Sequence, residues 1–364
     1  MTFIVTIGRG SMDRYSLKLA RHLRVPKLFT DIYQKVAEMF NVPLVSCRSL
    51  YALWQDANFL RRLRRLDDIL HFPNHHMGRY GLFLRQPYVI TVHDLIRYFD
   101  LKGYGTYIHR PNLRDRIYLN MDYAGIRRAA AIIAISETTK RDIVRHLGYP
   151  EERIFVVYHG IDHDLFRPVE ERPIEEPYVL FVGSEHPRKN LPALLRAFKL
   201  VKDSDSRFRH LKLVKVGAAG GREAPFRQYT LRAMAEIGLD GDVVFAESVP
   251  DHELPAYYSG AEVLVNPSLY EGFGFPPVEA MACGCPVIVS KAGALPEVVG
   301  DAGLAVDPND PLALAEAIRQ VLTDSSLRRR LVEAGLQRAA QFTWERCARE
   351  TEQVYERVEA ELAA

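Results

Sequence analysis

The sequence predicts an α/β protein of two domains, each built around a doubly wound parallel sheet. Short apolar runs rich in Val and Ile alternate with helical patterns from one end of the chain to the other, and several runs are apolar at every position. Strands that helices cover on both faces have this composition, because neither face meets water. The length of 364 residues favours two domains, since a single core stops growing at roughly 250–300 residues.

Nine segments carry the predicted strands, four in the front part of the chain and five in the rear part. The predicted strands are TFIVTI (2–7), YVITV (88–92), AIIAI (131–135), IFVVY (154–158), YVLFV (178–182), LKLVKV (211–216), DVVFA (242–246), EVLVN (262–266) and PVIVS (286–290). Helical patterns lie between them, which is the order of a parallel sheet with crossover helices.

A proline-rich segment sets the predicted domain boundary. Residues 166–177 hold three prolines and several glutamates, with neither a helical nor a strand period. That composition is typical of a linker. We therefore expect a first domain at 1–165 and a second at 178–342.

The last segment of the chain, 343–364, predicts a long terminal helix. An apolar stripe with helical spacing runs through Cys347, Val354 and Val358. Thr343 directly before it is a residue type that caps helix N-termini.

Composition and charge exclude several classes of protein. The chain is 48% hydrophobic and 26% charged, and no apolar run approaches the roughly 20 residues that span a bilayer. Its four cysteines lack paired spacing and the first residues run straight into a strand, so we expect a protein of the reducing cytoplasm. Residues 1–170 carry 26 Lys and Arg against 17 Asp and Glu, a net charge of +9. This excess indicates an anionic partner such as a membrane surface, nucleic acid or phosphorylated acceptor.

The stretch EGFGFPPVEA, which begins at Glu271, follows the strand predicted at 262–266. Loops at the carboxyl ends of parallel strands bind ligands in open α/β sheets. Gly272 and Gly274 let the backbone approach a ligand, and the Pro-Pro step suits the first turn of a helix that carries Glu279. The two carboxylates can accept hydrogen bonds from the hydroxyls of a sugar or ribose. Without the surrounding motifs, the simpler interpretation would be that Glu271 is an ordinary turn residue and Glu279 an ordinary residue on the surface of a helix.

A second loop follows the predicted strand 178–182, in the stretch GSEHPRKNLPALLRAF. Arg188 and Lys189 precede Asn190, which we expect to cap the next helix. Two cations beside a helix N-terminus form a strong anion site, because the formal charges, the amides and the helix dipole act together. The loop therefore predicts a site for a pyrophosphate, although a solvated basic turn would have the same composition.

Three motifs in this order resemble the donor-binding half of retaining glycosyltransferases with the GT-B fold. They are FVGSEHPRKN, VVFAESVPDHELPAYYSGAEVLVNPS and YEGFGFPPVEAMACGCPVIVS. The resemblance is to glycosyltransferase family 4, group 1, the large family related to sucrose synthase and to bacterial mannosyl- and glucosyltransferases. It extends into the first half through VITVHDL and AIIAISETTKRDIVRHLGYPEERIFVVYHGID. It implies two Rossmann-like domains that face a cleft, with a terminal helix that returns to the first domain.

The resemblance also implies a role for each motif of the second half. Glu271 would hold the sugar hydroxyls of the donor, and Glu279 would hold the ribose of its nucleotide. Arg188 and Lys189 would neutralise the diphosphate, and residues 245–249 would border the base. The donor-binding residues that it implies are Gly183, Arg188, Lys189, Gly272, Phe273, Gly274, Glu279 and, in a glycine loop of the first half, Gly10.

Ser184 departs from the family pattern, because many relatives carry an arginine directly after the glycine of the first motif. The phosphate role therefore falls to Arg188 and Lys189, whose charges would stabilise the departing diphosphate without a metal ion. No Asp-x-Asp pair follows a strand end in the second half, so we expect no metal and no other cofactor. The family implies retention, and no carboxylate must act as a covalent nucleophile, which favours a front-face displacement.

The first half supplies the expected acceptor side. His93 and Asp94 follow a predicted strand; a lone histidine there is usually structural, but the resemblance assigns His93 a catalytic contact with the sugar, while Asp94 orients the loop. His75, in HFPNHHMGRYG, is expected on a loop that lines the acceptor side, since its cluster lacks the acids and cysteines of a metal site. Gly10 lies after the first strand in a loop that lacks the third glycine of a dinucleotide fingerprint. Ser136 is expected to cap a helix.

The stretch NFLRRLRRLDDIL (58–70) predicts a helix with four leucines on one face, Leu60, Leu63, Leu66 and Leu70, and four arginines around them. A solvated helix packed on its own sheet explains this pattern, and attachment to an anionic membrane surface is the other interpretation. Nucleic-acid binding is less favoured, because aromatic side chains for stacking are not interleaved with the basic residues.

Together these motifs predict a retaining glycosyltransferase. It would move a hexose, mannose or glucose, from a nucleoside diphosphate sugar to a hydroxyl of a lipid-linked or polysaccharide glycan. Two alternatives stay open: an epimerase or phosphorylase of the same architecture, and a catalytically silent protein that binds sugar nucleotides or glycans. A phosphorylase would need a pyridoxal phosphate lysine site, of which the sequence shows no sign. We expect a cytoplasmic protein, with peripheral contact at the inner face of the membrane left open.

Overall fold

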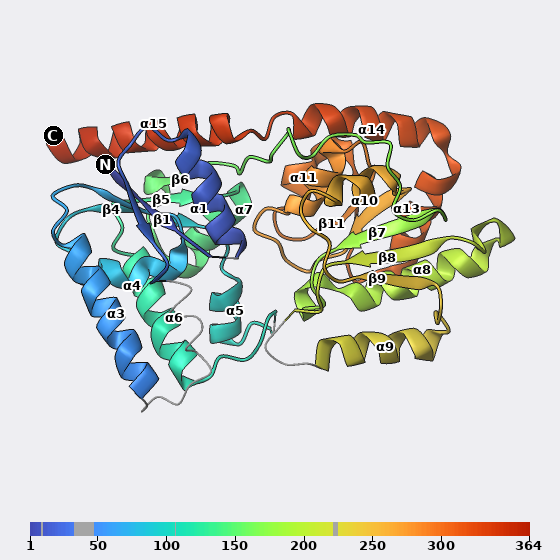
Figure 1. The fold of residues 1–364 in the computed structure, drawn as a ribbon, viewed down its shortest axis with the longest axis horizontal. Coiled ribbons are helices and arrows are strands. Elements are labelled where there is room, and N and C mark those ends of the chain that lie inside the picture. Colours follow the sequence, from blue (N-terminus) through green and yellow to red (C-terminus); the bar gives the residue numbers. More distant parts are fainter. Residues whose placement is uncertain (9, 33–46, 106, 221–224) are drawn as a thin grey trace. The chain divides into compact units, whose positions relative to one another are not determined.

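Figure 1 shows the fold of the chain in a computed structural model, which describes residues 1–8, 10–32, 47–105, 107–220 and 225–364. Contacts between residues divide the chain into two compact units. Unit 1 comprises Met1–Gly160 together with Trp344–Ala364, and unit 2 comprises Ile161–Thr343. Residues 166–177 therefore lie within unit 2.

Unit 1 is built on a six-stranded sheet in which every neighbouring pair is parallel. The strands, in their order across the sheet, are β2 (Lys27–Thr30), β1 (Thr2–Thr6), β3 (Leu70–Phe72), β4 (Tyr88–Val92), β5 (Ala131–Ala134) and β6 (Ile154–Val156). All five residues of β1 and of β4 are buried, as expected of strands covered on both faces. The strand order reverses between β1 and β3, and ligands bind at such points in open parallel sheets.

The helices of unit 1 cover this sheet, and one of them comes from the far end of the chain. The helices are α1 (Ser11–His22), α3 (Cys47–Leu63), α4 (Gly78–Gly81), α5 (Ile96–Lys102), α6 (Leu113–Ile126), α7 (Glu137–Asp142) and α15 (Trp344–Ala363). The predicted stripe on α15 is buried, with Cys347, Val354 and Val358 in one apolar cluster with Phe3 and Leu19. The terminal helix therefore belongs to the core of unit 1.

Unit 2 repeats the arrangement with a second six-stranded parallel sheet. Its strands, in order across the sheet, are β12 (Leu304–Val306), β11 (Val287–Ser290), β10 (Val263–Asn266), β7 (Tyr178–Val182), β8 (Lys212–Val216) and β9 (Val243–Ala246). Here the order reverses between β7 and β10, which pair through Val179 and Leu180 of β7. The loops that follow these two strands therefore leave the same edge of the sheet side by side.

Helices on this second sheet bury one large core. They are α8 (Leu191–Ser204), α9 (Pro225–Ile237), α10 (Leu254–Gly260), α11 (Phe275–Ala282), α12 (Leu295–Val299), α13 (Pro311–Thr323) and α14 (Ser325–Ala339). Phe198 of α8 and Ile318 of α13 are fully buried in a cluster with Phe181 and Val265 of the sheet. No helix in the described part of the chain is long and apolar enough to cross a membrane.

The structure confirms the α/β class and all nine predicted strands, and it adds three strands that the sequence did not predict. These are β2, β3 and β12. Two of them have three residues each, and the third, KLFT, begins with a charged residue and is half exposed. Such short segments lack the extended apolar run that identified the others.

The helix predicted over 58–70 is wrong in its bounds. α3 ends at Leu63, and Leu70 begins β3. Leu66 donates its backbone N–H to Leu63 O in a turn at 3.0 Å. The evenly spaced leucines therefore belong to three local structures.

Candidate functional site

The loops after β7 and β10 meet at the carboxyl edge of the sheet in unit 2. The backbone N–H of Leu269 donates to Arg188 O at 2.7 Å, and the Asn190 side chain donates to Pro267 O at 3.2 Å. These bonds join the predicted basic loop to the segment that leads to Glu271. Neighbouring strands in the parallel sheet thus bring together two motifs that lie 82 residues apart.

Glu271 lies at the centre of this site and pairs with both predicted cations. Its Oε1 accepts a hydrogen bond from Lys189 Nζ at 2.5 Å, and its Oε2 lies 3.0 Å from Arg188 Nη1. Glu271 and Lys189 each expose only 8% of their surface. The cluster therefore combines two cations with one carboxylate and carries a net positive charge in a largely desolvated position.

Electrostatics keep the Glu271 carboxyl group ionised. Burial acts to raise its pKa, but the charges of Arg188 and Lys189 and the hydrogen bond from Ser268 outweigh burial and lower the pKa to about 2. Burial lowers the pKa of Lys189, and the Glu271 carboxylate opposes that shift. A phosphate that entered beside Glu271 would meet two preorganised cations.

Several side chains that sequence reasoning missed hold Glu271 in place. Ser268 Oγ donates to Glu271 Oε1 at 2.9 Å and also contacts Asn266 Oδ1 at 2.6 Å. Gly293 lets the next loop approach, because a Cβ there would lie 2.6 Å from the backbone N and O of Glu271 and φ is +58°. The Ala294 N–H donates to Glu271 O at 2.9 Å. The Asn-Pro-Ser sequence directly after a strand was the one local signal for part of this support.

Asn190 does not have its predicted role. Its side chain makes no cap hydrogen bond to α8 and donates instead to the carbonyls of Pro267 and Pro308, the latter at 2.8 Å. Its φ is +53°, the only positive value among the described residues other than glycine. Asn tolerates that conformation better than other side chains, so the residue forms the turn between Lys189 and α8 and links two other loops.

The glycine loop and α11 arrange the remaining predicted donor residues. Gly274 directly precedes α11 with φ +99°, a conformation that favours glycine. The Phe273 side chain is 3% exposed and packs edge-on against Phe275 at 5.3 Å between ring centroids. Glu279 lies on α11, where its Oε2 accepts a hydrogen bond from Tyr258 at 2.6 Å. Gly272 is buried in the loop between Glu271 and Phe273.

Gly183 lies at the end of β7, beside the cation cluster. Its φ is +153°, and a Cβ at this position would lie 3.5 Å from Cε of Lys189. That distance is an ordinary contact, so the positive φ, and not lack of space, favours glycine here.

A second charged network, which sequence reasoning missed, follows β7, β8 and β9. The buried Glu185 carboxylate pairs with Lys215 at 3.2 Å and with Arg227 at 2.6 Å. The Arg227 guanidinium lies over the Phe245 ring at 4.0 Å from its centroid. Thus the predicted base-side segment that begins at Phe245 adjoins a cation and a fully buried lysine.

The predicted histidines of unit 1 form a separate, neutral cluster. The His93 N–H donates to His75 Nδ1 at 3.2 Å, and His93 Nε2 donates to Pro73 O at 2.7 Å. The His93 ring lies 5.2 Å from the His159 ring and 4.8 Å from the Tyr15 ring. Burial lowers the pKa of His93 to about 4 and that of His75 well below its usual range. These imidazoles are therefore uncharged at neutral pH.

The other predicted residues of unit 1 have local contacts. Asp94 Oδ1 accepts the Ile96 N–H at 2.9 Å, which orients the loop after β4. The Gly10 N–H donates to the Asp13 carboxylate at 3.2 Å, directly before α1. Ser136 Oγ accepts the Thr139 N–H at 3.0 Å, which confirms the predicted helix cap.

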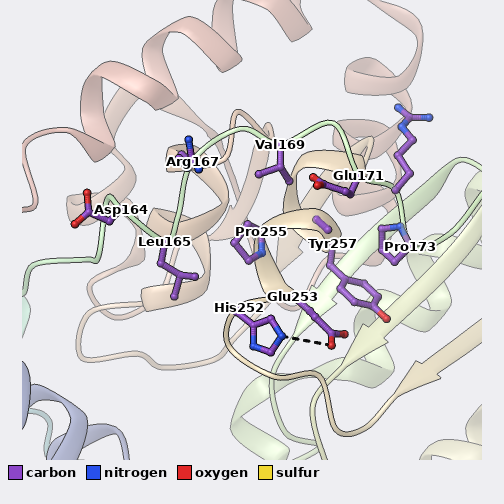
Figure 2. A pocket seen from close by; sticks show the side chains of 12 residues that line it. Asp164, Leu165, Arg167, Val169, Glu171, Pro173, His252, Glu253, Pro255 and Tyr257 are labelled. Carbon is purple, nitrogen blue, oxygen red and sulfur yellow. Dashed lines mark ion pairs between the residues drawn. The ribbon is translucent and has the colours of Figure 1, made fainter.

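A pocket of about 460 Å³ lies elsewhere in unit 2 (Figure 2). It lies between the segment that starts at Asp164 and the start of α10, with His252 and Glu253 on its wall. None of the predicted site residues lines it. Among the described residues, no group of three or more His, Cys, Asp or Glu side chains is arranged to hold a metal ion.

Two family models match consecutive parts of the chain. The model described as Glycosyltransferase Family 4 matches residues 15–165, and the model described as Glycosyl transferases group 1 matches residues 162–338.

Curated relatives include two mannosyltransferases. O-antigen chain mannosyltransferase B of Escherichia coli is 30% identical across 94% of this chain and 95% of its own length. MMP alpha-(1->4)-mannosyltransferase of Mycolicibacterium hassiacum is 34% identical across 68% of this chain and 59% of its own.

Solved structures share the fold along the whole chain. Sucrose-phosphate synthase from Thermosynechococcus elongatus superimposes with a TM-score of 0.76 at 24% identity, covering 99% of this chain and 98% of its own. HepE of Anabaena, solved in complex with UDP-glucose, has a TM-score of 0.76 at 19% identity and covers 99% of this chain and 100% of its own. These likenesses establish the two-domain GT-B architecture.

Proposed function

This chain belongs to the group 1 glycosyltransferases of glycosyltransferase family 4, and from that membership we propose that it moves a hexose from a nucleoside diphosphate to a hydroxyl acceptor. Mannose is the first candidate for the sugar, because O-antigen chain mannosyltransferase B is similar along nearly its whole length. Glucose is the second candidate. The observation that carries the proposal is the buried cluster of Glu271, Arg188 and Lys189 at the point where the strand order reverses.

The proposed mechanism rests on the charges of that cluster. Cleavage of the anomeric C–O bond places negative charge on the departing diphosphate, and Arg188 and Lys189 would stabilise it from fixed positions. Glu271 would accept hydrogen bonds from the sugar hydroxyls, assisted by amides of the loop from Gly272 to Gly274, while Glu279 would bind the ribose. We propose that the reaction retains configuration by front-face displacement and requires no metal ion.

We assign the donor to the domain predicted at 178–342 and the acceptor to the domain predicted at 1–165, with 343–364 as the returning helix. The segment 166–177, expected as a linker, lies within unit 2. His93 would contact the donor sugar from the acceptor domain. Because Nε2 of the neutral imidazole already donates to Pro73 O, Nδ1 can accept one hydrogen bond, which suits a hydroxyl donor.

The proposed acceptor is a lipid-linked or polysaccharide glycan, used in the cytoplasm. The net charge of +9 over residues 1–170 supports an acceptor that carries phosphate or lies at an anionic membrane surface. Peripheral contact at the inner face of a membrane is part of the proposal, whereas nucleic acid is not.

Turnover of a panel of nucleotide sugars tests the proposed activity. The protein would be incubated with GDP- and UDP-hexoses and glycan acceptors, and released nucleoside diphosphate and the glycan product would be measured. We expect Lys189→Met to reduce release at least about 100-fold, because it removes a charge that acts on the leaving group. Lys199→Met is the matched control, since Lys199 forms an exposed ion pair with Asp203 at 2.8 Å.

The same assay separates the alternatives. Binding of a nucleotide sugar without release, with every acceptor tried, would favour a silent binding protein. A change in sugar stereochemistry without a new glycosidic bond would favour an epimerase. Equal activity of Lys189→Met and Lys199→Met would contradict the assignment of the cluster to the diphosphate.

A further inference from the structure

Helix α3 has two apolar faces, and only one of them is buried. Ala52, Phe59 and Leu63 are each at most 3% exposed and pack into unit 1. A second stripe with helical spacing points outward and includes Leu50 at 67%, Leu53 at 56% and Trp54 at 58% exposure. Large side chains that face water in such a row are uncommon on a monomeric protein and mark an interaction surface.

The outward stripe borders an apolar pocket of about 300 Å³ between α3, α4 and α6. The residues that line it are Leu53, Asp56, Ala57, Leu60, Arg79, Tyr80, Phe83, Ile117, Tyr118 and Met121. Phe83 and Ile117 are 47% and 46% exposed, so the pocket opens to the surface between apolar side chains. We call this cavity the α3 pocket.

The charged side chains in the wall of the α3 pocket, Asp56 and Arg79, already have partners. Tyr80 donates a hydrogen bond to Asp56. The Arg79 guanidinium pairs with the buried Asp122 at 3.1 Å and stacks over the Tyr118 ring at 4.8 Å from its centroid. A ligand that fills the pocket therefore meets hydrocarbon and aromatic surface and finds no unpaired carboxylate to repel it.

Exposed arginines border the same face. They are Arg61, Arg64 and Arg128, here named the arginine rim; Arg61 lies on the outward face of α3 by helical spacing. Arg64 donates to Phe83 O at 2.8 Å and Arg128 to Leu82 O at 3.4 Å, which places both beside the pocket. On the described parts of α3 and α6 the acidic residues are Asp56, Asp115 and Asp122, and each is paired. The exposed formal charge on these two helices is therefore positive.

We propose that this face of unit 1 rests on an anionic lipid bilayer and that the α3 pocket takes one hydrocarbon chain of a bilayer lipid. Apolar side chains together with arginines match a lipid, which has an anionic head beside its hydrocarbon. A second copy of this chain fits less well, because a two-fold contact through this face would set the arginine rim against itself. This inference rests on the peripheral membrane contact of the proposed function and assigns it a surface. It involves none of the donor-binding residues, so its failure would leave the proposed hexose transfer unaffected.

Vesicle binding tests the surface. The full-length protein would be titrated with vesicles of phosphatidylglycerol and phosphatidylcholine, and with pure phosphatidylcholine. We expect the protein to bind only vesicles that contain the anionic lipid. The vesicle affinity should fall about fivefold in Arg61→Gln and in Arg64→Gln. It should fall about 100-fold in the L53E/W54E double variant. Leu312→Glu is the control, since Leu312 is 69% exposed on α13 of unit 2. Glu271→Ala should bind vesicles like the unaltered protein.

The pocket itself needs a separate measurement. Trp54 is exposed and the chain has 2 Trp residues, the other being the buried Trp344, so vesicles with brominated acyl chains should quench Trp54 alone. Dodecyl phosphate below its micelle concentration should bind with 1:1 stoichiometry in calorimetry, and inorganic phosphate should not. Ala57→Phe fills the pocket at an exposed position and should abolish the dodecyl phosphate signal.

Three results would overturn the proposal. The first is that L53E/W54E binds vesicles as well as Leu312→Glu does. The second is that Ala57→Phe binds dodecyl phosphate as well as the unaltered chain does. The third is that light scattering shows a dimer, which the L53E/W54E substitutions dissociate. Thermal unfolding of each variant verifies that it is folded before binding is compared.

Discussion

Each unit has a six-stranded parallel sheet whose strand order reverses once, but the loops at the carboxyl edges of the two sheets bury opposite chemistry. In unit 2, at the reversal between β7 and β10, Glu271 and Lys189 are buried beside the half-buried Arg188, and the two cations keep the Glu271 carboxylate ionised. In unit 1, the loops after β3 and β4 bury His75 and His93 against each other, and both are neutral. Burial is similar in the two places, so partners decide the charge: a buried group stays ionised only where an opposite charge compensates its desolvation.

Breaking the ion cluster should have the largest effect on stability. Glu271→Ala leaves the buried Lys189 and the half-buried Arg188 without their carboxylate and should lower the free energy of unfolding by about 3–5 kcal/mol. Denaturant titration measures this loss, with Glu316→Ala as control because its partner Arg319 is on the surface. Adding Lys189→Met to Glu271→Ala should recover part of the loss; a double variant less stable than Glu271→Ala would contradict the compensation argument.

Acid should weaken unit 1 before unit 2. The folded pKa values of His71 and His93 are about 3 and about 4, below the 6.5 of an unfolded histidine. The unfolded chain therefore binds more protons below pH 6.5, and each histidine removes up to about 1.4 kcal/mol of stability per pH unit as the pH falls toward its folded pKa. Glu271, with a pKa of about 2, loses its contribution only as the pH falls below about 4.

Tryptophan fluorescence can follow this acid effect, because both tryptophans lie in unit 1. Unfolding midpoints should decrease as the pH is lowered from 7.5 to 5. Burial also lowers the pKa of His159 well below its usual range, so His159→Phe should flatten this dependence. His252→Gln is the control, since His252 is on the surface. An unfolding midpoint that stays the same between pH 7.5 and 5 would contradict the predicted destabilisation by the buried histidines.

Asn190→Ala should have an intermediate effect. It removes hydrogen bonds to Pro267 and Pro308 and places alanine at φ +53°, which together should lower the unfolding free energy by about 2–3 kcal/mol. Ser136→Ala in unit 1 removes one helix cap and should lower it by about 1 kcal/mol. Equal losses in the two variants would contradict the linking role of Asn190.

Tyr258→Phe should have the smallest effect. It removes the hydrogen bond to Glu279, so we expect a loss of about 1 kcal/mol in donor binding, near a fivefold rise in KM with little change in kcat. Measurement of KM for the best nucleotide sugar tests this, with Tyr257→Phe as the neighbouring control. A fall in kcat with KM unchanged would place Glu279 in the chemical step.

Local pattern predicted much of the fold and singled out Arg188, Lys189 and Glu271, which the structure brings together. The apolar runs identified nine strands, and the Pro-Pro step correctly indicated the start of α11 at Phe275. Local pattern failed where an element was short or where leucine spacing continued across a turn, as at Leu66. It also failed at Asn190, because asparagine is common both as a helix cap and as a residue that links two loops, and the local sequence is the same in either case.

The sequence by itself determined the α/β class, the basic loop before α8 and the acidic loop before α11, because helix and strand signals depend on nearby residues. Only the tertiary structure decided that β7 pairs with β10, and that pairing brings Lys189 within 2.5 Å of Glu271 across 82 residues. It also decided that Ser268 and Gly293 support the carboxylate and that α3 carries a second apolar face. Which strands become neighbours depends on how helices cover the whole sheet, and no short stretch of the chain contains that information.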